Sequence, residues 1–311
     1  MSAYRRLVLA TLLLAFCVIV AGAYVRLSEA GLGCPDWPLC YGRAFPGDDL
    51  GASALQRAWK EMAHRYLAGG LGLLILAVFF TAWRRRQGVL LAGALLLVVI
   101  FQATLGMWTV TLLLRPAIVA AHLLGGMATL ALLLWLFFSL GSHAGAPEAR
   151  ALRLPALAAL LAVVTQIALG GWVSANYAAL ACPDLPLCLG AALPPMDFHN
   201  AFHVFRELGQ TSSGERLPAE ALTAIHWTHR IFALVVVAAV GWAAFKAFPA
   251  MRTLAVAVAA LLALQFSLGV ANVAFNLPLP LAAAHNAGAA LLLASLVVLN
   301  FFSFRGLRPS W

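Results

Sequence analysis

Long apolar runs alternate with short polar segments along the whole chain. Each of eight runs has about the 20 residues that an α-helix needs to cross a hydrocarbon core of about 30 Å. The runs are 7–24, 66–83, 89–112, 117–140, 154–175, 222–245, 254–275 and 281–302. The pattern therefore predicts an all-α integral membrane protein with eight transmembrane helices.

Composition supports this prediction and argues against two classes of function. Of the 311 residues, 63% are hydrophobic and only 10% are charged. That is too little charge for the surface of a soluble enzyme of this size. The net charge is +9, but the basic residues form small groups between apolar runs rather than one stripe, which disfavours nucleic-acid binding.

The basic groups predict how the chain crosses the bilayer. With a cytoplasmic N-terminus, the inner segments hold eleven basic residues and one acid, and the outer segments hold nine and ten. This split follows the positive-inside rule, so we expect a bacterial plasma membrane with both termini cytoplasmic. Arg5, Arg6 and the later Ala21-Gly22-Ala23 also resemble a cleaved secretory signal. A counterpart of this first helix later in the chain favours its retention.

That counterpart belongs to an internal repeat. The segment CPDWPLC at 34–40 returns as CPDLPLC at 182–188, and the intervening histidines return at similar offsets. The repeat predicts two tandem four-helix bundles, 1–146 and 147–311. Because four is an even number, both copies enter the membrane in the same direction. A pseudo-two-fold axis along the membrane normal should therefore relate them.

Four histidines recur between the copies at matched depth. They are His64, His122, His229 and His285. Helical rise places all four near the outer edge of the bilayer, at the starts of the even-numbered helices. A single histidine there is more often a satisfied interfacial residue, but two per repeat favour a ligand role, because ionisable groups at this depth usually face the bundle interior.

Two imidazoles per bundle suit haem iron, which needs only two axial ligands from the protein. A tetrahedral zinc site would want more ligands than recur at that level. We pair His64 with His122, and His229 with His285, as two haem sites. Glycines of the partner helices either admit a flat ring or pack helices together. They are Gly22, Gly106, Gly170, Gly171 and Gly269.

One residue breaks the symmetry between the copies. Glu61 stands three residues before His64, whereas His226 stands three before His229. The i, i+3 spacing puts each on the face of its histidine. A carboxylate there would serve a reaction that moves protons or builds positive charge. The alternative is a helix N-terminal carboxylate favoured by the macrodipole.

The remaining cysteine and polar residues have further candidate roles. Cys34 with Cys40, and Cys182 with Cys188, are expected to be structural disulfides or an electron shuttle. Cys17 is expected in the core of the first helix. Arg65 and Arg230 either bind haem propionates or snorkel. Gln102, Gln166 and Gln265 are expected to bridge helices through hydrogen bonds. His199 and His203 either bind a metal ion or, as we prefer, belong to an interfacial amphipathic segment at 198–205.

Together, the cysteine loop, E-x-x-H-R in the second helix, H-x-x-H-R in the sixth and histidines in the fourth and eighth resemble the haem A synthase family. The likeness covers essentially the whole chain. It implies oxidation of the haem O ring methyl to the formyl group of haem A, in two steps with water as the oxygen source. It also implies work alongside haem O synthase and cytochrome oxidase assembly.

The resemblance also implies roles for individual residues. His64 and His122 would hold the substrate haem, and His229 and His285 would hold a haem b cofactor. Glu61 would be the catalytic carboxylate, with Cys34–Cys40 as a disulfide relay. Two other readings fit the residues alone: a di-haem cytochrome b that passes electrons between quinol and an outer acceptor, and a haem-free transporter.

Overall fold

The protein is almost entirely helical in the computed structural model, which describes residues 1–309. The long helices are α1 (Ala3–Leu27), α2 (Ala52–Arg85), α3 (Val89–Thr111), α4 (Pro116–Ser139), α5 (Arg153–Ala175), α7 (Ala219–Ala247), α8 (Arg252–Ala274) and α9 (Leu279–Arg305). Smaller elements are α6 (Phe198–Ala201), a 3-10 helix (Pro147–Leu152), and strands β1 (Ala144–Gly145) and β2 (Leu307–Arg308).

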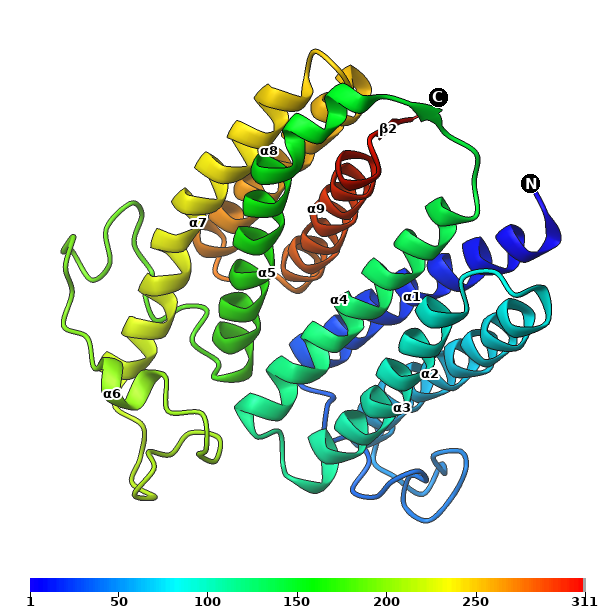
Figure 1. Ribbon diagram of the computed structural model, residues 1–311. Helices are drawn as coiled ribbons and strands as arrows, with labels where there is room; N and C mark the ends of the chain where they lie inside the picture. The colour runs from blue at the N-terminus through cyan, green and yellow to red at the C-terminus, as the bar shows by residue number, and fades with distance from the viewer. Residues whose placement is uncertain (310–311) are drawn as a thin grey trace.

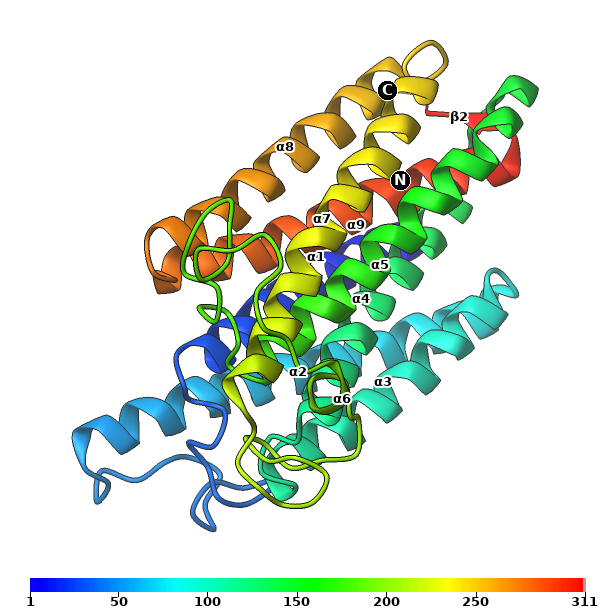
Figure 2. The same cartoon turned by 90° about the vertical axis from the view of Figure 1, so that its left-hand side faces the viewer.

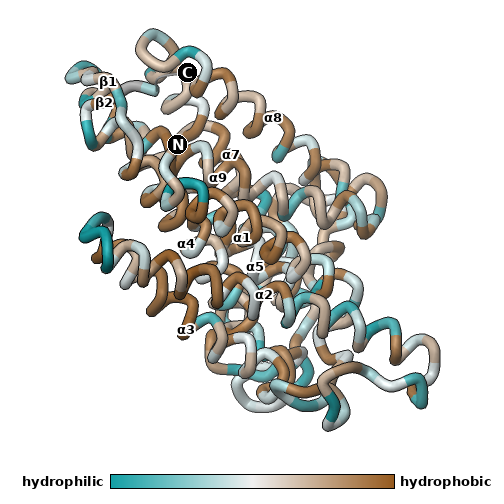
Figure 3. Tube along the Cα trace, turned by 90° about the vertical axis from the view of Figure 1, so that its right-hand side faces the viewer, coloured by the Kyte–Doolittle hydropathy of each residue, from teal (hydrophilic) through white to brown (hydrophobic). Residues whose placement is uncertain are grey.

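All eight long helices within the described residues are long and apolar enough to cross a membrane. The prediction of an all-α, eight-span, multi-pass membrane protein is confirmed. Hydrophobic residues fill the middle of the helices, and hydrophilic residues gather at their ends and in the connections (Figure 3).

The first four helices lie together, and so do the last four long ones (Figure 1). In the first group α1 and α3 each pack on both α2 and α4. In the second group α5 and α8 each pack on both α7 and α9, so the pairs of neighbours are the same in both groups. The groups meet where α9 contacts α1 and α4, and where α4 contacts α5. The two-fold axis and the boundary between 146 and 147 remain predictions that this matching pattern supports.

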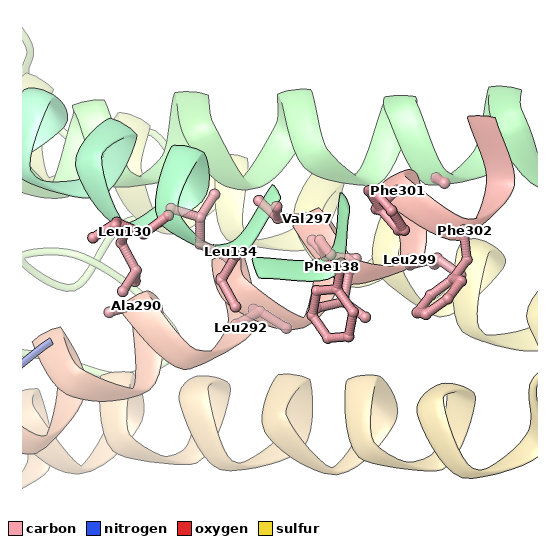
Figure 4. Packing of buried hydrophobic residues seen from close by; sticks show 14 of the residues in the cluster. Leu130, Leu134, Phe138, Ala290, Leu292, Val297, Leu299, Phe301 and Phe302 are labelled. Carbon is pink, nitrogen blue, oxygen red and sulfur yellow. The ribbon is translucent and has the colours of Figure 1, made fainter. Parts of the chain in front are cut away.

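A large apolar core joins the two groups near the chain termini. It includes residues of all eight long helices, and Leu134, Phe138, Leu292 and Phe301 are its members on α4 and α9 that Figure 4 labels, among others. Burial of such side chains contributes about 2 kcal/mol each when it removes them from water, but within a bilayer their close packing is what holds helices together. The four histidines singled out in the sequence lie toward the opposite end of the molecule.

That opposite end carries the connecting loops. The segment between α1 and α2 and the longer segment that contains α6 lie at the same end, away from both termini (Figures 1 and 2). This placement agrees with the arrangement expected from the repeat, in which both cysteine segments are on one side of the membrane.

Three expectations need correction. The helix α2 begins at Ala52 rather than near residue 66, so His64 lies about three turns inside it and not at its start. Charged residues lower the mean hydropathy of these extra turns, so the apolar pattern does not include them. Ala58 and Met62 of the same turns are buried against Cys34. Glu61 is therefore not an N-terminal carboxylate of α2.

The other two corrections concern the exposure of Cys17 and the length of the helix in segment 198–205. Cys17 is exposed rather than in the core of α1. The amphipathic segment at 198–205 is reduced to the single turn of α6, because the chain leaves the helix at Phe202. Phe198 and Phe202 still stack, with ring centroids 6.3 Å apart.

Candidate functional site

Each of the four histidines faces a glycine on the helix that precedes its own in the bundle. A Cβ atom added to the glycine would lie very near Cε1 of the ring. The pairs are Gly22 with His64 (2.8 Å), Gly106 with His122 (3.4 Å), Gly170 with His229 (3.0 Å) and Gly269 with His285 (3.2 Å). These glycines make room for the imidazole itself. Gly171 differs, since its Cβ would meet Leu123 and Ala120 of α4, and it is a helix-packing glycine between the two groups.

The four imidazoles share a second property. Nδ1 of each ring is buried and has no hydrogen-bond partner among the described residues. A buried polar atom without a partner costs roughly 1–3 kcal/mol, and ligation of a metal ion uses such a ring nitrogen. Each of the four rings therefore has a nitrogen that could ligate a metal ion.

The structure also brings the histidines together as expected pairs. His64 and His122 are close enough to interact electrostatically, and so are His229 and His285. Within residues 1–309, no group of three or more His, Cys, Asp or Glu side chains could hold a bare metal ion. A pair of imidazoles can serve an iron only when a ligand such as porphyrin supplies the other positions. The residues present thus fit haem.

Glutamines of neighbouring helices stand beside the second pair. Gln166 Nε2 donates to the backbone carbonyl of His229 at 3.0 Å, and the same nitrogen is 3.4 Å from His229 Nε2. Gln265 Nε2 is likewise 3.4 Å from His285 Nε2. The expected bridging by glutamine is confirmed at these two positions, where it links α5 to α7 and α8 to α9.

Glu61 is held in a buried scaffold one turn before His64. Its side chain is almost inaccessible, and both carboxylate oxygens have partners. Oε2 accepts the backbone N–H of Cys34 at 2.9 Å, and Oε1 accepts Arg65 Nη2 at 2.5 Å. This is a close ion pair within one helix face, because the two residues are four apart. A carboxylate accepts both bonds without conflict.

His226 occupies the equivalent scaffold in the second half. The N–H of Cys182 lies 3.2 Å from Nδ1, and Arg230 Nε lies 3.2 Å from Nε2. A neutral imidazole has only one acceptor nitrogen, so it satisfies one of these donors at a time. The same framework therefore holds a carboxylate in one half and an imidazole in the other.

The two cysteine loops form the outer wall of these scaffolds. Disulfides join Cys34 to Cys40 and Cys182 to Cys188, with S–S distances of 2.02 Å and 1.95 Å. All four cysteines are fully buried. The first loop contributes a backbone amide to Glu61, so the loop and the carboxylate form one unit. A redox role for either pair remains a prediction.

The two arginines bind these loops. Arg65 Nη1 donates to the carbonyls of Asp36 at 3.0 Å and Leu39 at 2.7 Å. Arg230 donates to the carbonyls of Asp184 at 2.7 Å and Cys182. Their contacts fix the loops above the histidines, and binding of haem propionates by either arginine remains a prediction.

The sequence also carries a signal for the glycine partners. Gly22 and Gly170 are separated by the offset of the cysteine loops, and Gly106 and Gly269 by that of the histidines His122 and His285. Gly106 and Gly269 therefore repeat in step with the histidines that they face, whereas Gly22 and Gly170 precede the insertion that adds 17 residues to the offset from His64 to His229. The bond from Cys34 to Glu61 had no such signal, because it uses a backbone amide.

Residues 5–297 match the COX15-CtaA family of cytochrome oxidase assembly proteins. The chain belongs to this family. The match runs through all the long helices and includes both histidine pairs, both disulfide loops and Glu61. The resemblance noted in the sequence is confirmed at this level.

Two of three similar relatives cover nearly the whole chain, and the third covers about two thirds of it. A heme A synthase of Shewanella oneidensis is 41% identical over 94% of this chain and 94% of its own length. A heme A synthase of Halalkalibacterium halodurans is 31% identical over 68% of this chain and 72% of its own. One from Caulobacter sp. (strain K31) is 29% identical over 95% and 94%. The likeness therefore extends over both halves.

Proposed function

We propose that this protein is a haem A synthase, which oxidises the ring methyl of haem O to the formyl group of haem A. Support comes from relatives of that name that align along the whole chain, and from two buried histidine pairs. The observation that carries the proposal is the difference within a common scaffold: Glu61 beside one histidine pair and His226 beside the other.

The reaction has a simple balance. A methyl group and one water give an aldehyde, four protons and four electrons, in two oxidation steps that each release two electrons. The enzyme must therefore remove protons near the substrate and pass electrons away. Glu61 would remove protons in the first half, and a second haem site would pass the electrons away.

The first half takes the substrate, haem O, between His64 and His122. The second half keeps haem b between His229 and His285, where bound haem b supplies one-electron transfer. His64 with His122, and His229 with His285, would each supply both protein ligands of an iron, which would agree with water rather than a bound dioxygen species as the oxygen source. Gln166 and Gln265 hold the ring orientation of the second pair through the contacts described above.

Glu61 is the proton acceptor, or the anion that stabilises positive charge on the substrate. Its position is fixed before the substrate arrives, because Cys34 and Arg65 each hold one carboxylate oxygen. The Cys34–Cys40 disulfide beside it can serve as a relay. Its reduction to two thiols would take two electrons and two protons, which equals the output of one oxidation step.

The proposed setting is a bacterial plasma membrane with both termini in the cytoplasm. The disulfide loops then face the outer, oxidising compartment, where paired thiols persist as disulfides. Haem O synthase would supply the substrate and cytochrome oxidase assembly would consume the product.

The test is direct identification of haems. The gene is expressed in cells that make haem O but no haem A, and haems are extracted from membranes and from purified protein for chromatography. We expect haem A in the membranes and haem b in the purified protein. Two bound b haems with no haem A would instead favour the di-haem cytochrome b, and the absence of any Soret band would favour the transporter.

A further inference from the structure

An open groove of about 540 Å³ leads from the side of the helix bundle to His64. Three helices form it: α1, α2 and, from the other half, α9 through Ala283. Its other lining residues are Phe16, Cys17, Val20, Ala21, Tyr24, Val25, Lys60, Ala63, His64 and Leu67. The walls are largely apolar, and Lys60 is their one cation.

The groove has a polar outer end and an apolar inner end. On α2, Lys60 lies one turn before His64 and Leu67 one turn after it, so all three share a face. The Lys60 ammonium stands over the ring of Tyr24, 5.2 Å from its centroid. Since α1 runs outward and α2 inward, Phe16 and Leu67 lie deeper than this rim.

The equivalent place in the second half is covered at its outer end. By the offsets of the repeat, Tyr24 corresponds to Trp172 and Lys60 to Ile225. Tyr24 is 39% exposed, whereas Trp172 is 9% and Ile225 is 1% exposed. Both of these buried side chains pack in a cluster with Ala201 of α6.

The longer loop of the second half makes this cover. Trp172 Nε1 donates to the carbonyl of Ala201 at 2.8 Å. Arg206 lies over the Trp172 ring, 5.6 Å from its centroid, and donates to Asn176 Oδ1. Figure 2 shows α6 and its flanking loop at the end of α7. The first half has no counterpart of this insertion, which is 17 residues long by the repeat offsets.

Side-chain size adds to the contrast. Phe16 and Val20 have smaller counterparts in the second half, Val164 and Ala168. Three other groove residues have larger counterparts, and substitution of each by its counterpart would narrow the groove. The pairs are Ala21 with Leu169, Ala63 with Thr228, and Leu67 with Phe232. The first half thus has an open rim at Tyr24 and Lys60, where the long loop covers the equivalent residues of the second half.

We propose that this groove is the bilayer-side binding site for haem O. Its inner end, at Phe16, Cys17 and Leu67, holds the long isoprenoid chain, and Lys60 at the rim pairs with a propionate. Haem O has both an anionic end and a hydrocarbon chain, which matches the polarity of the groove from rim to depth. The inference rests on the proposed function, because that function assigns the first half to the substrate.

Cys17 provides a test that does not require turnover. It is the protein's free thiol, since the other four cysteines form disulfides, and it lines the groove. Purified protein in lipid nanodiscs is treated with a small maleimide, and the labelling rate is followed by mass spectrometry with no addition, with haem b or with haem O. At about ten times its Kd, haem O should slow labelling about tenfold, because about one site in eleven is then empty. Haem b, which lacks the chain, should give much less protection.

The outcomes separate the two proposals. Haem O binding is recorded independently as a Soret change that requires His64 and His122. If that change appears and Cys17 labels at the same rate with and without haem O, the groove assignment is wrong and the proposed function stands. If haem O gives no Soret change, the substrate role of the first half is wrong. Protection by nanodisc lipid alone, with no further effect of haem O, would identify the groove as a lipid site and overturn the inference.

A filled-groove variant gives a second readout. Ala21→Leu, Ala63→Thr and Leu67→Phe together introduce the residues of the second half. We expect the KM for haem O to rise about tenfold, equivalent to about 1.4 kcal/mol of binding, with the haem b spectrum unchanged. The matched control is Leu73→Phe, since Leu73 is exposed on α2 and nine residues, or two and a half turns, from His64. An unchanged KM in the filled variant would contradict the assignment.

Discussion

The two halves of the molecule use one framework for two environments. In each half a disulfide loop donates a backbone amide to the residue one turn before a glycine-facing histidine, and an arginine contacts that residue from the other side. The two halves differ in which residue this framework holds, and in whether a groove leads from the bilayer to the histidine. On the function proposed above, a few substitutions and one loop insertion separate a site that exchanges its haem from one that retains it.

The largest expected effect tests the residue held by the framework. Glu61→Gln should lower haem A formation by about 100-fold or more, because general acid–base groups contribute roughly that factor. His226→Gln should lower it less than about tenfold, since that side chain stands beside the retained haem. Haem A is quantified by chromatography, with total haem as the control for folding. Equal losses in the two variants would remove the functional distinction between the halves.

The next effect tests the glycines. Gly170→Val should displace His229 and weaken haem b binding by about 10–100-fold, the range seen when the support of a metal ligand is disturbed. Gly22→Val should leave haem b in place and weaken haem O binding instead. Gly72→Val is the control, since a Cβ there meets only Val99, at 3.9 Å. Loss of haem b in the Gly22 variant would show that the sites are not independent.

A smaller effect separates the two disulfides. Removing either pair, as Cys34→Ser with Cys40→Ser or Cys182→Ser with Cys188→Ser, should cost about 2 kcal/mol in the chain-entropy estimate for so short a loop. Only the first change should also lower haem A formation, by about tenfold, because Cys34 positions Glu61. Thermal unfolding and haem analysis are measured on both. Full activity without Cys34–Cys40 would exclude both the relay and the positioning role.

The smallest effect concerns a contact between two loops at the end of the molecule that lies away from both termini. Arg115 and Glu207 form an ion pair at 3.2 Å, with side chains 47% and 60% exposed. Exposed pairs contribute about 0–1 kcal/mol, so Arg115→Ala should shift the Tm by at most a few degrees and leave both haem sites intact. A large loss of haem b would mean that this contact holds the long loop over the second half.

Most of the fold could be predicted because a helix that crosses the hydrocarbon core of a bilayer needs about 20 consecutive apolar residues. Apolar runs bounded by arginines gave eight spans whose ends agree with the helices within a few residues, except at the start of α2. There Arg57, Lys60 and Glu61 end the hydropathic run while the helix continues. Those extra turns are stabilised by tertiary contact with the Cys34–Cys40 loop, which no local pattern contains.

The site could be predicted only in part, for a related reason. The histidines, cysteines and Glu61 repeat along the sequence and could be matched by offset. The Cys34 amide that holds Glu61 belongs to the backbone, so its identity leaves no mark in the residue types. The groove needs Ala283 from the opposite half of the chain, and a spacing analysis within one repeat does not bring that residue near His64.

The central claim is that each half binds one haem between its own histidine pair and that the pairs differ in role. The most direct measurement is the haem content and low-spin spectrum of four purified variants, His64→Ala, His122→Ala, His229→Ala and His285→Ala. We predict that the last two lose haem b, and that the first two keep it but no longer bind added haem O. Retention of haem b in both His229→Ala and His285→Ala, or its equal loss in all four, would contradict the account.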